Sequence, residues 1–166
     1  MPIVDALLPE YDHELATTRR VLERVPEAEF GWKPHDKSMT LGQLAGHVAN
    51  MPWWLTMTLA ATFYDAVPGA KGAGLEVPPS HADMMRAFDE KVKEARASLA
   101  RVTDPEMMVP WTLKANGQEI FTMPRVSVVR SFVLNHLIHH RGQLSVYLRL
   151  RDVPVPSIYG PTADEQ

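Results

Sequence analysis

Residues 124–150 read PRVSVVRSFVLNHLIHHRGQLSVYLRL. Apolar residues recur in this stretch at three- and four-residue spacing, and Pro124 before it and Pro154 beyond it are typical of helix boundaries. The pattern predicts one long helix. Because an α-helix turns about 100° per residue, His136 and His140 lie side by side on one of its faces, one turn apart. Two imidazoles in that arrangement can share a metal ion.

The rest of that helix face predicts the surroundings of the two histidines. It also carries Gln143 and Tyr147, and the apolar Val129 and Val133 indicate that it points into the core. Arg141 is expected to point away from it. A buried ring nitrogen without a hydrogen-bond partner costs roughly 1–3 kcal/mol, so interior histidines need either a bound cation or polar partners in the core. Both alternatives stand at this point.

Three earlier segments have the same apolar spacing and predict helices over residues 4–24, 41–65 and 81–101. Thr40, followed three residues later by Gln43, has the form of a capping box at the start of the second of these helices. Four long helices in this order indicate an antiparallel four-helix bundle.

A small β-hairpin is predicted between the third and fourth helices. Two runs rich in β-forming residues, 109–113 and 119–122, flank Asn116-Gly117, a dipeptide that supplies the positive φ angles of a tight turn. Residues 66–80 are rich in proline and glycine and are predicted to form a loop.

The length and composition fit one domain over residues 1–166, and the predicted elements make its fold class all-α. The chain has 45% hydrophobic residues and a net charge of −3, with lysine and arginine scattered, so we expect no nucleic-acid partner. No leader-like or eighteen-residue apolar segment occurs, so we expect a soluble, cytoplasmic protein with no membrane partner. With no cysteine, a metal must be held by other ligands, and thiol chemistry must use an external thiol.

His47 is the best third ligand. It lies in the predicted second helix among apolar neighbours, and bundle cores commonly take metal ligands from facing helices. A lone histidine there would more often be a hydrogen-bonded core residue, but the set of His47, His136 and His140 favours a metal site. His139 diverges by about 100° from His140 and is assigned a supporting or structural role. The remaining histidines are expected to face solvent: His13, His35 and His81.

Several motifs together resemble the DinB/YfiT-like superfamily of metal-binding four-helix bundles. They are WKP at 32–34, SMTLGQL at 38–44 followed by His47, HLIHHRGQ at 136–143, and IYGP at 158–161. The resemblance spans nearly the whole chain. It implies that His47, His136 and His140 coordinate one divalent ion, zinc or nickel. It further implies a homodimer, and thiol transfer or thiol-dependent isomerisation with a low-molecular-weight bacterial thiol, as in several members of the family.

A cation with three imidazole ligands keeps a position open for water or substrate and acts as a Lewis acid. No acidic residue lies on the histidine face to serve as a general base, which weakens the case for hydrolysis. Four residues are candidates for substrate binding, with ordinary core packing or structural hydrogen bonding as their alternative roles. They are Asn50, Trp54, Gln143 and Tyr147.

The leading functional hypothesis is a metal-dependent enzyme of the thiol S-transferase type that acts on a small-molecule substrate. The alternatives are a metal-dependent hydrolase and a non-catalytic metal-binding stress-response module. Leu134, Ile138 and Leu148 form a second apolar face on the fourth helix. We expect this face to bury a homodimer contact, unless the hairpin or the C-terminal tail covers it.

Overall fold

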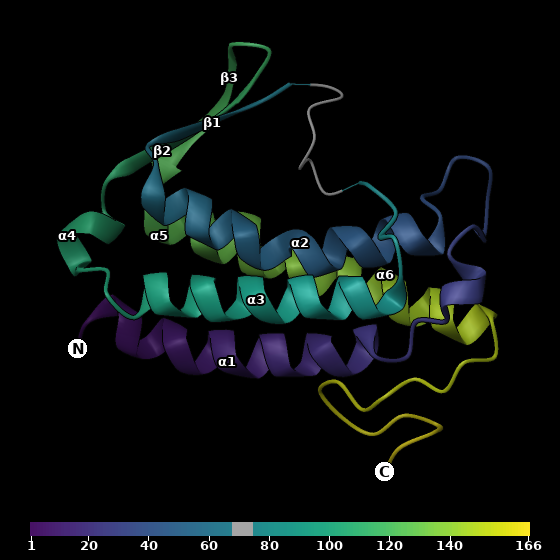
Figure 1. The fold of residues 1–166 in the computed structure, drawn as a ribbon. Helices are drawn as coiled ribbons and strands as arrows, with labels where there is room; N and C mark the ends of the chain where they lie inside the picture. Colours follow the sequence, from purple (N-terminus) through teal and green to yellow (C-terminus); the bar gives the residue numbers. More distant parts are fainter. Residues whose placement is uncertain (68–74) are drawn as a thin grey trace.

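The computed structural model of the protein describes residues 1–67 and 75–166. Within them the chain is mostly helical, and four long helices lie side by side (Figure 1). These helices are α1 (Ile3–Leu22), α2 (Leu41–Ala60), α3 (His81–Leu99) and α6 (Asn135–Leu150). The shorter helical elements are η1 (Glu27–Glu29), α4 (Asp104–Met107), α5 (Arg125–Ser127) and η2 (Val128–Leu134). The four predicted helices are therefore present, with starts within a few residues of those expected except where α5 and η2 precede α6.

Side-chain caps fix the starts of α2 and α3. The Thr40 hydroxyl accepts from the Gln43 backbone N–H at 3.2 Å, and the Gln43 side chain accepts from the Thr40 N–H at 2.9 Å. Ser80 caps α3 by accepting from the Asp83 N–H at 3.0 Å. Each contact satisfies a backbone donor that the first helical turn leaves open. The predicted capping box is confirmed, and it sets the rotation of α2 from its first turn.

The prediction that α2 continues to residue 65 is wrong. The helix ends at Ala60, and Phe63–Ala66 form strand β1. The Thr112 N–H donates to the Thr62 carbonyl at 2.9 Å as the two strands begin to pair. Main-chain hydrogen bonds to a distant strand thus replace those of another helical turn, a tertiary contact that apolar periodicity does not encode.

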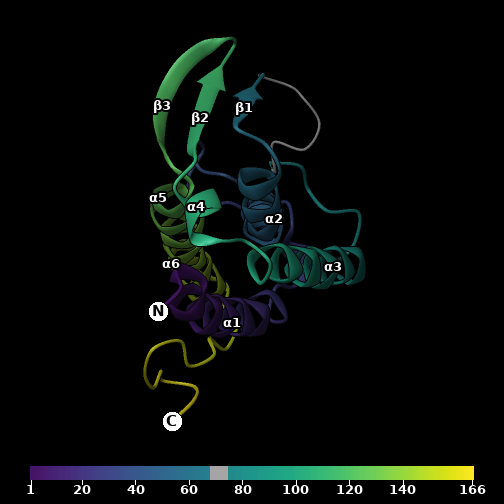
Figure 2. The same ribbon diagram turned by 90° about the vertical axis from the view of Figure 1, so that its left-hand side faces the viewer.

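The sheet has three strands rather than the two of the predicted hairpin, so the all-α expectation holds only for the helical majority. β2 (Pro110–Ala115) lies between β1 and β3 (Gln118–Pro124), parallel to the first and antiparallel to the second. Asn116 and Gly117 turn the hairpin with φ angles of 51° and 77°, which confirms the predicted turn. The sheet stands above one end of the helices (Figure 2).

The helices do not alternate in direction, so the expected antiparallel order is wrong. Side chains from residues 46–50 line one cavity with residues 83–91, near the start of both helices. Residues 56–60 share a second pocket with residues 98–102, near both ends. α2 and α3 are therefore parallel to each other, as the ribbon colours also show (Figure 1). The connection between them must return along the bundle, and it contains β1. Most of the predicted loop at 66–80 lies outside the described residues.

α5, η2 and α6 follow one another without a break, which confirms the long helical stretch predicted before Leu150. Its middle part is a π-helix, in which the Asn135 N–H reaches back five residues to the Arg130 carbonyl. A π-helical residue turns the chain by less than an α-helical one. The face that enters the core from α6 is consequently not the predicted one, and it consists of Leu137, Arg141, Leu144 and Leu148.

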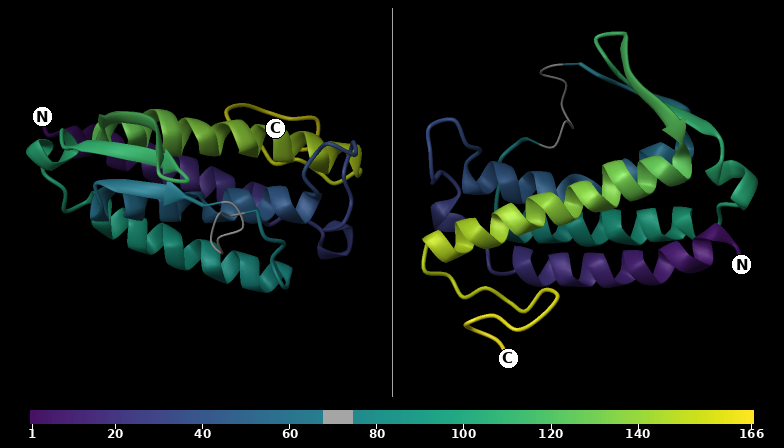
Figure 3. Two further views of the ribbon diagram at one scale, coloured as in Figure 1. Left: turned by 90° about the horizontal axis from the view of Figure 1, so that it is seen from above. Right: turned by 180° about the vertical axis from the view of Figure 1, so that it is seen from behind.

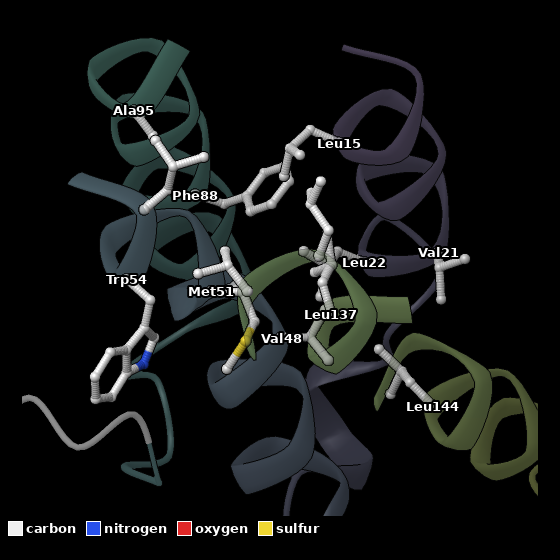
Figure 4. Close-up of a cluster of buried hydrophobic side chains, with 14 of the residues drawn as sticks. Leu15, Val21, Leu22, Val48, Met51, Trp54, Phe88, Ala95, Leu137 and Leu144 are labelled. Carbon is white, nitrogen blue, oxygen red and sulfur yellow. The ribbon is translucent and has the colours of Figure 1, made fainter. Parts of the chain in front are cut away.

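The core lies between the four long helices (Figure 4). Leu22, Val48 and Leu137 meet at its centre, and Trp54 lies at the edge of the drawn cluster. Leu134 and Leu148 are buried within this core, so they form no free apolar face. The reason given for a homodimer is therefore wrong, and the homodimer itself stays a prediction.

The segment after α6 folds back against the bundle, as expected for the tail (Figure 3). Glu165 pairs with Arg20 of α1 and with Arg24 just beyond its end, and Asp164 pairs with Arg149 of α6. These contacts hold the tail along the side of α1 and α6. No helix within residues 1–67 or 75–166 combines the length and the hydropathy that a membrane span requires.

Candidate metal centre

Three histidines from two helices converge between α2 and α6. The Nε2 atoms of His47 and His136 are 3.4 Å apart, and those of His136 and His140 are 2.8 Å apart. The ring centroids of His47 and His140 are separated by 4.6 Å. One potential ligand atom from each ring lies within 4.8 Å of the others. The structure thus brings together the three residues that sequence reasoning grouped, across 89 positions of the chain.

Burial differs among the three rings. His47 is 8% exposed, in the middle of the core-facing side of α2, whereas His136 and His140 are half-buried. The latter two lie at the edge of the buried face of α6 rather than at its centre. This corrects the expectation that both are interior, and it leaves one side of the cluster open to small molecules.

Hydrogen bonds at the outer nitrogens orient two of the rings. His140 Nδ1 lies 2.7 Å from Gln143 Oε1, and because an amide oxygen only accepts, Nδ1 carries the proton. The His136 side chain bonds to the Phe132 backbone carbonyl, another group that only accepts. Such a partner on the far nitrogen is typical of metal-binding histidines, because it fixes both the ring and its tautomer.

The environment keeps these two rings in their neutral form. Burial lowers the pKa of His136, and the nearby His140 and His139 lower it further. Burial also lowers the pKa of His140, whereas the hydrogen bond that its ring donates to Gln143 acts in the opposite direction. A neutral imidazole is the form that binds metal, so the site is set for ligation near neutral pH.

The donor set fits a divalent ion. Two nitrogens that share a tetrahedral zinc ion lie about 3.3 Å apart, because each Zn–N bond is about 2.0–2.1 Å. The 3.4 Å between His47 and His136 matches this value. The 2.8 Å between His136 and His140 is shorter. That distance is in the range of a hydrogen bond between the two rings, and ligation of one ion by both would move the nitrogens apart towards the tetrahedral value.

The four predicted substrate-binding residues lie in different surroundings. Gln143 contacts His140 directly, as described above. Trp54 is almost fully buried and packs edge-on against Phe132 and Tyr64. Tyr147 donates to the Met39 carbonyl at 3.3 Å. All of these lie along the same side of α2 and α6 as the histidines.

Asn50 has a different position. It lines a cavity of about 540 Å³ between α2, α3 and residues 76–79, and no histidine lines that cavity within the described part of the chain. This cavity is therefore on another flank of α2, and we take the histidine cluster as the functional site because it holds the convergent ligand atoms.

The other histidines are separate from the cluster. His139 is exposed, and its ring packs at 4.8 Å against that of His140, so a supporting role stays a prediction. His13 and His35 are exposed, as predicted. His81 is only half-exposed, with Nε2 3.0 Å from the Leu22 carbonyl, so its prediction as a solvent-facing residue is wrong.

Sequence reasoning missed two neighbours of the site. Tyr64 lies on the unpredicted strand β1, and Phe132 lies in the π-helix with its ring 5.6 Å from that of His136. It also misplaced Arg141, which was expected to point away but is buried beside Glu14. Only the apolar character of Phe132 and Tyr64 was available in the sequence as a signal.

Comparison with known proteins identifies similar chains. A profile of the DinB superfamily matches residues 10–144. The uncharacterized protein YrdA of Bacillus subtilis (strain 168) is 25% identical over 162 residues, which cover 98% of this chain and 91% of the relative.

Two solved structures have a similar fold. A DinB-like protein from Bacillus cereus ATCC 10987 superimposes with a TM-score of 0.73 at 21% identity, covering 95% of this chain and 98% of its own. The DinB-like protein YjoA from Bacillus subtilis gives a TM-score of 0.67 at 15% identity, covering 97% and 99%.

Proposed function

Since this chain belongs to the DinB superfamily, we propose that it is a metal-dependent enzyme of the thiol S-transferase type. His47, His136 and His140 hold one divalent ion, with zinc or nickel the best candidates for three imidazole ligands. The observation that carries this proposal is the convergence of one ligand atom from each of the three rings, all within 4.8 Å of one another. A cation shared by the rings accounts for that convergence.

A divalent ion held by three imidazoles supplies an open Lewis-acidic position, which stabilises a thiolate near neutral pH. The residues of the chain do the rest. Gln143 holds the His140 ring in its ligating orientation, and the carbonyl of Phe132 does the same for His136. The ring of Phe132 shields one side of the site from water.

S-transfer fits the site better than hydrolysis does. A hydrolase of this kind needs a general base beside the open position, and α2 contains no carboxylate among its residues 41–60. On the histidine side of α6 the described neighbours are an amide and a phenol, Gln143 and Tyr147. A thiol that is deprotonated on binding needs no such base.

The test is turnover by the metal-loaded protein with small bacterial thiols and alkyl or epoxide electrophiles, followed by mass spectrometry of the conjugates. We expect conjugation that disappears in His140→Ala and persists in His139→Ala, the matched change at the exposed neighbour. Product formation that needs no thiol would instead support hydrolysis. Metal binding without any metal-dependent product across the panel would contradict the enzyme proposal.

A further inference from the structure

The two helix faces that form walls at the histidine cluster carry no charged side chain among the described residues. Helix α2, which supplies His47, has no Asp, Glu, Lys or Arg in its twenty residues. The facing helical stretch consists of η2 and α6, and its side towards α2 carries Phe132, the two histidines and Tyr147. Two arginines of this stretch point towards α1 instead, where Arg130 pairs with Glu10 and Arg141 with Glu14.

Aromatic rings form a continuous surface that begins at one of the ligands. The ring centroid of Phe132 lies 5.6 Å from that of His136 and 5.4 Å from that of Trp54. Tyr64 then packs at 4.9 Å against Trp54 and at 5.7 Å against Trp53, all in edge-on geometry. Four aromatic side chains therefore extend from the metal ligands towards the sheet.

The surface is open enough to receive a ligand. Trp54 is buried beneath it, but Phe132, Tyr64 and Trp53 are each half-buried, so part of each ring remains accessible. Edge-on contacts leave ring faces and edges free for a further aromatic group, a packing mode that adds affinity beyond the apolar area it covers. β1 brings Tyr64 to this surface, and because that strand was not predicted, helix periodicity could not predict the surface either.

Charge balance specifies which group of the ligand binds the metal ion, at the opposite end from its aromatic ring. Three neutral imidazoles leave a divalent ion with its full charge, and no described carboxylate lies on the charge-free walls to offset it. A ligand with a single negative charge at its metal-binding atom offsets part of the charge of the ion where the dielectric constant is low. Further charged groups on the ligand would lose their water against the aromatic rings without gaining a partner of opposite charge.

We propose that the substrate of this centre is a monoanionic molecule with an uncharged aromatic body. Its anionic sulfur or oxygen binds at the histidine cluster, and its ring packs against Phe132, Tyr64 and Trp53. This inference rests on the metal centre of the proposed function, and it adds the substrate class. Tyr64 and Phe132 are specificity-determining residues in this arrangement.

The experiment uses the Co²⁺-loaded protein, in which thiol binding is followed by the sulfur-to-cobalt charge-transfer band. The probes are benzyl mercaptan, 2-mercaptoethanol and mercaptosuccinate. We expect benzyl mercaptan to bind at least about tenfold more tightly than 2-mercaptoethanol, because one aromatic contact contributes up to that factor and the buried apolar area adds to it. Mercaptosuccinate, with two added carboxylates, should bind most weakly.

Tyr64→Ala should abolish the preference for benzyl mercaptan while the visible cobalt spectrum without thiol stays unchanged. Phe63→Ala is the matched control, because Phe63 is the neighbouring strand residue, 53% exposed and in contact with Lys114 on the other side of β1. Phe132→Leu provides a second variant that keeps most of the side-chain volume if Tyr64→Ala unfolds the sheet.

Four outcomes would overturn the inference. Equal affinity for benzyl mercaptan and 2-mercaptoethanol contradicts the aromatic body, as does a preference that survives in both Tyr64→Ala and Phe132→Leu. Tightest binding of mercaptosuccinate contradicts the charge argument. Absence of any cobalt bands in the unmodified protein contradicts the metal centre itself, and with it both proposals, so the two failures are distinguishable.

Discussion

Arg141 and Glu14 form an ion pair at 2.7 Å in which the two side chains are only 1% and 7% exposed. The guanidinium also donates to the Glu14 backbone carbonyl at 3.0 Å and to the Thr18 hydroxyl at 3.2 Å. Tyr159 of the tail completes the arrangement, since its hydroxyl donates to the Glu14 carboxylate at 2.9 Å. Because Arg141 directly follows His140, this pair fixes the rotation of α6 at the metal ligands.

Removing one partner of this pair should be strongly destabilising. Arg141→Ala leaves the Glu14 carboxylate buried without its cation, a change that typically costs about 3–5 kcal/mol of the free energy of unfolding. Chemical denaturation of the metal-free protein, monitored by circular dichroism, measures the loss.

Arg96→Ala is the control for Arg141→Ala. Arg96 pairs with Asp12 at the same 2.7 Å, but the two side chains are 50% and 44% exposed, and solvent screens such pairs. The loss there should be much smaller than the loss in Arg141→Ala, because solvent screens the exposed pair. Similar losses in the free energy of unfolding for the two variants would show that burial does not make the Arg141 pair more important for stability.

Metal addition should stabilise the folded protein through the three histidines. A ligand at 100 times its dissociation constant adds about 2.7 kcal/mol to the free energy of unfolding when it binds only the folded state. We expect Zn²⁺ to raise the melting temperature of the unmodified protein, chelation to reverse the rise, and His47→Ala to remove it.

His13→Ala is the matched control for His47→Ala, because His13 is exposed on α1. Its response to Zn²⁺ should equal that of the unmodified protein. A melting temperature that rises equally in His47→Ala would place zinc binding outside the cluster.

Features were predicted correctly from the sequence when the interacting residues are close together along the chain. The Thr40 cap, the Asn116-Gly117 turn and the histidine spacing on α6 are local, and each was predictable from a few neighbouring residues. Strand β1 was not, because its pairing partner lies about fifty residues away. The pairing of His47 with the other two histidines came from a bundle argument and a family resemblance rather than from local pattern.

The misplacement of Arg141 has a specific cause. The core-facing side was extrapolated from Val129 and Val133 with the α-helical period, but both lie in the π-helix. Each π-helical residue turns the chain less, so the apolar face reaches α6 at Leu137 and Arg141 instead of at His136. The sequence around an arginine does not indicate whether a buried carboxylate on another helix will pair with it.

Acid should destabilise the metal-free protein through His136 and His140. Burial lowers the pKa of both in the folded state, so the unfolded chain binds more protons once the pH falls below about 6.5, the usual pKa of histidine. The free energy of unfolding therefore falls as the pH drops from 6.5 towards the lowered values and levels off beneath them.

Denaturation curves between pH 8 and pH 5 test this dependence, with the double variant His136→Gln and His140→Gln as the comparison. The double variant should lose less stability across that range than the unmodified protein does. An equal loss in both proteins would assign the acid sensitivity to other groups.

Gln143 should control metal affinity without binding the metal. Its Oε1 atom accepts from His140 Nδ1 at 2.7 Å and so keeps the Nε2 lone pair directed at the cluster. Loss of such an orienting partner typically weakens metal binding by about 10- to 100-fold.

Gln143→Ala should therefore raise the Zn²⁺ dissociation constant by that factor in calorimetric titrations. Gln143→Glu keeps an acceptor oxygen and should retain the affinity. Ser145→Ala controls for a small change on the same helix, since the Ser145 hydroxyl donates to the Gly142 carbonyl of its own turn. Because Gln143 is exposed, its loss should leave the stability of the metal-free protein nearly unchanged, which separates orientation of the ligand from support of the fold. Unchanged zinc affinity in Gln143→Ala would mean that the His140 ring is held by its packing against His47 and His139 alone.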